Sequence, residues 1–142
     1  MKTNAVAPAI FTLNGSGSGT AAAGNSTGGY NGPDNPALAG SVITLYLTGE
    51  GQTNPGGVTG KVTTVDMSPG GPLTPQPLAG APAVTIGGQP ATVTFYGEAP
   101  GMVAGAMQLN VQIPAGLRSG SQPLIVSLGG ASSQNGVTVS VR

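Results

Sequence analysis

A strict alternation of apolar and polar residues in the last third of the chain most constrains its fold. From Met107 to Ile113, apolar residues occupy every second position and alternate with glutamine and asparagine. The runs Gln122–Leu128 and Val137–Val141 also place leucines or valines at every second position, although Ile125 adds an apolar residue to the other face of the first run. A period of two places successive side chains on opposite faces of an extended strand. We therefore predict three half-buried antiparallel strands joined by short turns.

Two segments in the first half of the chain also predict strands. Ser41–Thr48 is the stronger, because three aliphatic residues share one of its faces. Pro8–Leu13 is a shorter candidate, followed by a turn in which glycine alternates with serine. Thr20–Asn25 has alanines that favour helix, but the neighbouring glycine and threonine favour a further strand.

The run from Val84 to Tyr96 predicts a β-hairpin. A Gly-Gly pair interrupts it, and glycine supplies the positive φ angles that a tight hairpin turn needs. Under strict alternation, Val93 and Phe95 share one face, and Thr92, Thr94 and Tyr96 share the other.

Together these segments predict an all-β fold, an immunoglobulin-like β-sandwich with long loops rich in glycine and proline. A closed β-barrel is the alternative. The 26 glycines and 13 prolines fall between apolar runs, as turns in a β-protein do. Gly49–Ala83 is the longest irregular region, with one candidate strand at Lys61–Asp66. We expect one β-domain over residues 1–142, with residues 1–13 as a candidate exchanged or docking N-terminal strand.

The charge content is low. Only 6% of the residues are charged and the formal net charge is zero, against about 25% charged residues in an average soluble protein. Little charge repulsion keeps copies of such a chain apart, which favours association or an extracellular setting. The absence of a basic patch argues against nucleic-acid partners. No apolar run approaches about 18 residues, so we expect no membrane insertion.

The residue types needed for common active sites are scarce. Histidine and cysteine are absent, which excludes Ser-His-Asp and Cys-His catalysis and ordinary zinc sites. Glu50 and Glu98 both follow glycines after strands and could form a glycosidase pair, although solvated loop charges are the better interpretation. Asp34 with Asn31 and Asn35 could hold calcium, and an Asx turn is the alternative. We expect no enzyme activity, no metal and no cofactor.

Several segments carry a family resemblance. They are Ile86–Ala91, Asn110–Gly116, Ser119-Gly120, Val126–Gly130, Pro8–Thr12 and Gly49–Pro55. The sequence resembles the Solibacter-type C-terminal domain family of secreted bacterial proteins, and its C-terminal hairpins are similar to IPT/TIG immunoglobulin-like domains. The resemblance implies an extracellular β-rich module and implies no catalytic residues. In that family the first strand follows an immunoglobulin-like half, so we expect either a fragment or a subunit whose neighbour is another copy.

These features favour a structural subunit of an extracellular bacterial filament or cell-surface assembly. Apolar strands at both chain ends offer edges to which another copy can add a strand. A head-to-tail contact of that kind does not close, so it produces filaments by strand complementation. We expect Val6 to Leu13 to complete the sheet of the next copy. The candidate self-association residues are Val6, Ala9, Ile10, Phe11, Leu13, Val137, Val139 and Val141.

An adhesion or carbohydrate-binding module of a larger secreted protein is the alternative function. The regions Gly49–Ala83 and Gly97–Gly105 would then carry the site, because long loops are often functional. Tyr30, Tyr46 and Tyr96 could form a platform on which sugars stack, although separate structural roles are the simpler interpretation. A glycan would be the partner in that case.

Overall fold

The structure consists of strands and turns, and the residues it describes contain no helix. The computed structural model describes residues 8–26, 28–48, 53–54, 76–77, 81–98 and 106–142. The all-β class predicted from the sequence is confirmed. The strands are β1 (Ala9–Ile10), β2 (Gly19–Thr20), β3 (Ala23–Asn25), β4 (Val42–Thr48), β5 (Thr53–Asn54), β6 (Gln76–Pro77), β7 (Ala83–Ile86), β8 (Gln89–Glu98), β9 (Met107–Gln112), β10 (Gly120–Leu128), β11 (Ala131–Ser132) and β12 (Val137–Val141).

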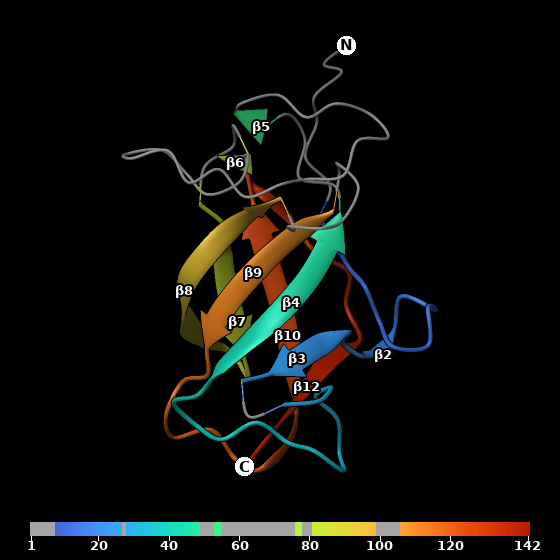
Figure 1. Ribbon diagram of the computed structural model, residues 1–142, viewed down its shortest axis with the longest axis vertical. Coiled ribbons are helices and arrows are strands. Elements are labelled where there is room, and N and C mark those ends of the chain that lie inside the picture. Colours follow the sequence, from blue (N-terminus) through green and yellow to red (C-terminus); the bar gives the residue numbers. More distant parts are fainter. Residues whose placement is uncertain (1–7, 27, 49–52, 55–75, 78–80, 99–105) are drawn as a thin grey trace.

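Among the described residues, ten strands form one curled sheet, which Figure 1 shows with β4, β9 and β8 in front of β7 and β10. The order is β1-β4-β9-β8-β7-β10-β12-β2, with β3 also on β4 and β11 also on β10. β2 runs parallel to β12, and the other strand pairs are antiparallel. β8 turns the sheet, because it pairs first with β7 and then with β9. β5 and β6 form a separate two-stranded sheet.

The curled sheet encloses an apolar core. The alternation predicted for β4, β9, β10 and β12 is confirmed at its apolar positions. Every second side chain is buried along β4 and β9 and, from Leu124 onward, along β10; in β12 the three valines are buried, and so is Ser140. Burying one such aliphatic side chain stabilises the fold by about 1.5–3 kcal/mol. The largest fully buried side chains are Ile43, Leu45, Leu47, Ile86, Met107, Leu109, Val111, Ile113, Leu124, Val126, Leu128 and Val137.

The predicted hairpin is present as β7 and β8. Gly87 and Gly88 form its turn with φ angles of 61° and 80°, which only glycine adopts without strain. At Gly87 a Cβ atom would also lie 2.8 Å from Leu117 Cδ2 and 2.8 Å from Gln122 Oε1. The backbone angle therefore requires glycine at this position, and a Cβ atom would also displace the ends of the Leu117 and Gln122 side chains.

The predicted facing of residues within β8 is wrong beyond Val93. Val93 pairs with Val111, but Phe95 pairs with Asn110, so a β-bulge places one extra residue between them. An extra residue reverses the facing of every side chain that follows it. Tyr96 therefore packs against the core, and Phe95 lies on the polar outer face.

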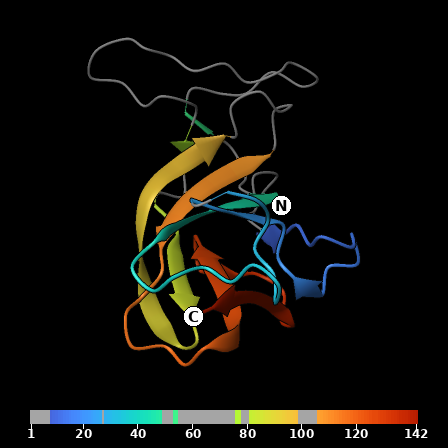
Figure 2. The ribbon, with the colours of Figure 1, turned by 60° about the horizontal axis from the view of Figure 1, so that its bottom comes forward.

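The N-terminal segment supplies the strands at both ends of the sheet order. After β1 on the edge of β4, the chain crosses to β2 on β12 and returns to β4 as β3, the path seen in blue in Figure 2. The predicted strand at Thr20–Asn25 is thus divided between β2 and β3. Thr12 pairs with Ala21, and the Leu13 N–H donates to the Thr20 carbonyl at 3.0 Å. Hydrogen bonds therefore run from β4 to β12 through this segment.

The long irregular region is described only in part. Within Gly49–Ala83, β5 and β6 pair, with Thr53 opposite Pro77 and Asn54 opposite Gln76. The predicted strand at Lys61–Asp66 lies outside the described residues.

Candidate functional site

The residues predicted for self-association differ widely in burial. Val6 lies outside the described residues. Four members belong to the core with at most 2% of their surface exposed, namely Ile10, Val137, Val139 and Val141. Ala9 is half-buried, whereas Phe11 is 38% and Leu13 48% exposed. The two predicted segments therefore meet the same core through β1 and β12, and the residues that follow β1 present apolar side chains at the surface.

β1 lies on the outer edge of β4 through a short pairing. Ala9 is opposite Thr48, and Ile10 is opposite Leu47. Ile10 is the one side chain of β1 that is buried. Directly beyond β1, the Phe11 N–H donates to the carbonyl of Tyr46 at 3.0 Å. One core side chain and a few backbone hydrogen bonds therefore hold this strand on β4.

The Gln134 side chain occupies the other edge of β1. The Ile10 N–H donates to Gln134 Oε1 at 3.0 Å, and Gln134 Nε2 donates to the Ile10 carbonyl at 2.7 Å. The side-chain amide thus pairs with both backbone groups of Ile10, as a neighbouring strand would. Sequence reasoning missed this role, because the two residues are 124 positions apart and nothing distinguishes Gln134 from other glutamines.

Asn31 makes the equivalent contact on β12. Its side chain is 1% exposed. Asn31 Nδ2 donates to the Ser140 carbonyl at 2.8 Å, and the Ser140 N–H donates to Asn31 Oδ1 at 2.7 Å. Asn31 Nδ2 also donates to Asn25 Oδ1 at 3.0 Å. This buried amide, which the sequence suggested only as a candidate calcium ligand, is therefore bonded at both its oxygen and its nitrogen.

The outer edge of β12 is occupied within the chain. β10 pairs with one edge, while β2 pairs with Val137 and Thr138 on the other. Farther along, the Ala37 N–H donates to the Ser140 carbonyl at 2.9 Å, and the Arg142 N–H donates to the Ala37 carbonyl at 2.9 Å. A neighbouring chain could add to β12 only by displacing these partners. The docking edge predicted there stays a prediction.

A shallow aromatic groove lies beside β3. It has a volume of about 570 Å³ and is lined by Phe11, Ala22, Gly24, Gly29, Tyr30 and Tyr46. It therefore gathers three of the five aromatic residues in the chain, which has three tyrosines and two phenylalanines. Of the predicted tyrosine platform, Tyr30 and Tyr46 do come together. Tyr96 does not join them, because it packs against the core.

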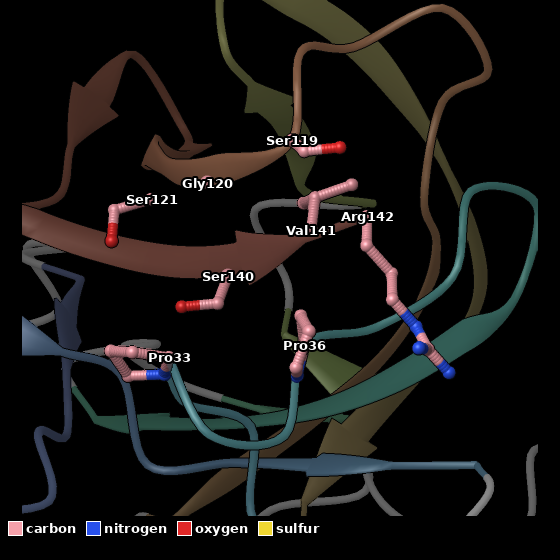
Figure 3. A pocket seen from close by; sticks show the side chains of 8 residues that line it. All are labelled: Pro33, Pro36, Ser119, Gly120, Ser121, Ser140, Val141 and Arg142. Carbon is pink, nitrogen blue, oxygen red and sulfur yellow. The ribbon is translucent and has the colours of Figure 1, made fainter.

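A second, smaller cavity lies between the loop at 33–36 and the facing ends of β10 and β12. Its volume is about 240 Å³, and Figure 3 shows Pro33 and Pro36 on one side and Ser119 on the other. Ligand pockets usually measure about 300–1,000 Å³. This cavity is below that range, and we assign it no ligand.

The acidic residues are only partly placed. Glu50 and Asp66 lie outside the described residues, and so does the side chain of Glu98, so the predicted pair Glu50–Glu98 is not described. Asp34 is exposed. In the predicted calcium grouping, Asn31 Oδ1 accepts a bond from Ser140 and faces β12 instead. The described part of the chain holds no group of three or more His, Cys, Asp or Glu side chains.

Comparisons with protein-family models, with curated proteins and with solved structures found no match. The resemblance to the Solibacter-type C-terminal domain family therefore stays a prediction. Within the described residues, no helix has the length and apolar character needed to cross a membrane.

Proposed function

We propose that the curled sheet is an immunoglobulin-like β-sandwich. In constant-type immunoglobulin domains, strands A, B, E and D form one sheet and C, F and G the other. The order β1-β4-β9-β8 followed by β7-β10-β12 supports this assignment, because β4, β7, β8, β9, β10 and β12 then take positions B to G in chain order. The pairing of Thr12 with Ala21 supports a closed barrel instead. Amide contacts between these two residues by NMR in solution favour the barrel, and their absence favours the sandwich.

We propose that the protein is a structural subunit of an extracellular bacterial filament or surface assembly. Each copy donates its N-terminal strand, including β1, to the edge of β4 in the next copy. The observation that carries this proposal is the attachment of β1 through one buried side chain, Ile10, and a two-residue pairing. Exchange into a neighbour reproduces every one of these contacts, which is why exchanged elements join copies at low cost.

The turn at 14–19 gives the strand a hinge. Gly15, Gly17 and Gly19 have φ angles of 72°, 82° and 96°, and a Cβ atom at Gly15 or Gly17 would meet nothing within 4 Å. Glycine adopts extended conformations as readily as these turn conformations. Straightening this turn would carry β1 away from its own β4 and break the backbone bonds that join Phe11 and Leu13 to the segment at 20–22, while β2 stays on β12 and β3 on β4.

Electron microscopy of the purified full chain tests this proposal. We expect filaments from the unaltered protein and none from Ile10→Asp, because the donated strand would insert a charge into the apolar core. The matched control is Leu13→Asp, whose side chain is exposed and which should still polymerise. Circular dichroism checks that Ile10→Asp remains folded, and Ile10→Ala replaces it if it does not. Single particles from the unaltered protein, or filaments from the folded Ile10 variant, would contradict the proposal.

The alternative function, an adhesion or carbohydrate-binding module, was predicted to use the regions Gly49–Ala83 and Gly97–Gly105. Almost all of both regions lies outside the described residues. The aromatic groove beside β3 is the described feature that supports carbohydrate binding, at a place other than these loops.

A further inference from the structure

We propose that the aromatic groove beside β3 binds a neutral oligosaccharide by stacking sugar rings on its aromatic side chains. Phe11, Tyr30 and Tyr46 reach the groove from three separate segments of the chain. Tyr30 is 68% exposed, the highest value among the exposed large hydrophobic residues of the described part. Exposing aromatic surface to water is costly, so the exposed rings of Phe11 and Tyr30 beside the half-buried Tyr46 indicate a surface that a ligand covers.

The rest of the groove lining consists of small residues. They are Ala22, Gly24 and Gly29, and none of them has a side chain larger than a methyl group. A Cβ atom at Gly24 would meet no atom within 4 Å, so the space above it is open. A flat or gently curved ligand therefore has room at Gly24 beside the aromatic lining.

The chemistry of the lining selects a neutral ligand with both apolar and hydroxyl-bearing surfaces. No charged residue is among the six lining residues. In the part of the chain that the structure describes, the Tyr30 and Tyr46 hydroxyls have no hydrogen-bond partner, so both are available to a ligand. A pyranose with equatorial hydroxyls offers an apolar C–H face for the rings and hydroxyls for these groups.

The outer face of β4 and β9 extends this surface with uncharged polar groups. Tyr46 is opposite Gln108 on β9. Gln108 Nε2 and Thr44 Oγ1 both donate to Asn110 Oδ1, at 3.1 Å and 3.2 Å. An oligosaccharide longer than the groove would continue over these amides and hydroxyls, which favours a chain of several sugars over a single one.

An added peptide strand does not suit the groove. The edge of β3 that faces away from β4 is already paired with the segment at 29–31. The Asn31 N–H donates to the Ala23 carbonyl at 2.8 Å, and the Asn25 N–H donates to the Gly29 carbonyl at 2.9 Å. Strand addition depends on free backbone groups at an edge, so the groove offers side-chain contacts and no free β-edge.

Titration with cellohexaose, a neutral oligomer of β-1,4-linked glucose with all-equatorial substituents, tests this inference. NMR of the full chain should show saturable shifts at the amides of Gly24, Gly29 and Tyr30. Tyr30→Ala and Tyr46→Ala should each weaken binding by about tenfold or more. Leu38→Ala is the matched control, since Leu38 is 45% exposed and does not line the groove, and it should leave binding unchanged.

Three results would overturn the inference. One is the absence of saturable shifts up to about 10 mM cellohexaose, a limit that corresponds to negligible affinity. Another is binding that survives both tyrosine substitutions. The third is a concentration-dependent dimer that Tyr30→Ala abolishes without any response to sugar, which would make a second copy the occupant. The inference does not rest on strand exchange, because the tyrosine substitutions leave the contacts between Ile10 and Leu47 in place.

Discussion

The strands β1 and β12, near opposite ends of the sheet order, meet the same core but are attached to it very differently. β12 contributes three buried valines, pairs with β10 along one edge and has its other edge occupied by β2, Asn31 and Ala37. β1 contributes one buried side chain, pairs with β4 over two residues and has Gln134 on its other edge. β12 is therefore an integral strand, and β1 is a peripheral one.

This difference indicates which end of the chain is suited to exchange between copies. Local opening of a protein costs least where few apolar contacts and few hydrogen bonds must be broken. Releasing β1 breaks a small, contiguous set of contacts next to a glycine-rich turn, whereas releasing β12 would open the core. The side-chain amides that bond the two strands differ in the same way. Asn31, which bonds β12, is buried, whereas Gln134, which bonds β1, is only partly buried.

The largest effect is expected from a charge placed in β12. Val139→Asp should lower the free energy of unfolding by about 3–5 kcal/mol or prevent folding, because Val139 is fully buried and the carboxylate would have no partner. Urea denaturation followed by circular dichroism measures the loss. The control Asn135→Asp adds the same charge at an exposed site and should change stability by less than about 0.5 kcal/mol. Equal losses in the two variants would refute the integral role of β12.

A smaller effect is expected when Asn31 is removed. Asn31→Ala leaves the Ser140 N–H buried without its acceptor, which should cost about 1–3 kcal/mol of unfolding free energy. Asn35→Ala is the control from the same loop, because the bonds of its side chain to the Gly28 and Tyr30 carbonyls are exposed. Thermal or urea unfolding should rank Asn31→Ala as the less stable variant, and the reverse order would show that the buried amide does not hold β12.

Removing Gln134 should loosen β1 without unfolding the rest. We expect Gln134→Ala to speed hydrogen exchange of the Ile10 amide about tenfold, a change of about 1.4 kcal/mol in local opening. Amides of β12 should keep their rates. Gln112→Ala serves as the control, because its amide bonds to the Gly40 carbonyl far from β1. If hydrogen exchange accelerated equally in β1 and β12, the two strands would open together, and β1 would not be the more weakly attached strand.

The smallest effect is expected at the turn that follows β1. Asn14 Oδ1 accepts bonds from the Ser16 N–H at 3.0 Å and from Ser16 Oγ at 2.7 Å, as in an Asx turn. Asn14→Ala should speed exchange of the Leu13 amide by about twofold to fivefold, since one exposed bonded group contributes about 0.5–1 kcal/mol. Ser18→Ala is the control and should leave the exchange rate of the Leu13 amide unchanged. An unchanged rate in Asn14→Ala as well would mean that the turn does not restrain β1.

The sequence was most informative where burial alternates along a single strand. β4, β9, β10 and β12 were predictable, because their period of two reflects a core on one side only. The turn of the β7–β8 hairpin was predictable from its two glycines. The facing of Phe95 and Tyr96 was not, because a β-bulge depends on register with the partner strand and not on local pattern.

The candidate sites were much less predictable than the strands. Gln134 and Ile10 are 124 residues apart, and Asn31 and Ser140 are 109 apart. A single amide side chain carries no periodic signal, so its partner is known only once the fold is known. The aromatic groove likewise depends on the bridge between Gly24 and Tyr30, which brings Tyr30 next to β3. Sequence reasoning grouped Tyr30 and Tyr46 as one option, but it included Tyr96 and omitted Phe11.

Disulfide trapping tests directly whether β1 is exchanged between copies. The chain has no native cysteine, and residues directly opposite on antiparallel strands lie about 4.5–5.5 Å apart between Cα atoms, within disulfide range. Ala9 and Thr48 are such a pair. Ala9→Cys and Thr48→Cys are purified separately, mixed and oxidised, so that this pair can form only between copies. We expect a disulfide-linked heterodimer on non-reducing gels, and none when Thr138→Cys replaces Thr48→Cys. A mixture that yields no more heterodimer than this control would contradict exchange of β1 between copies.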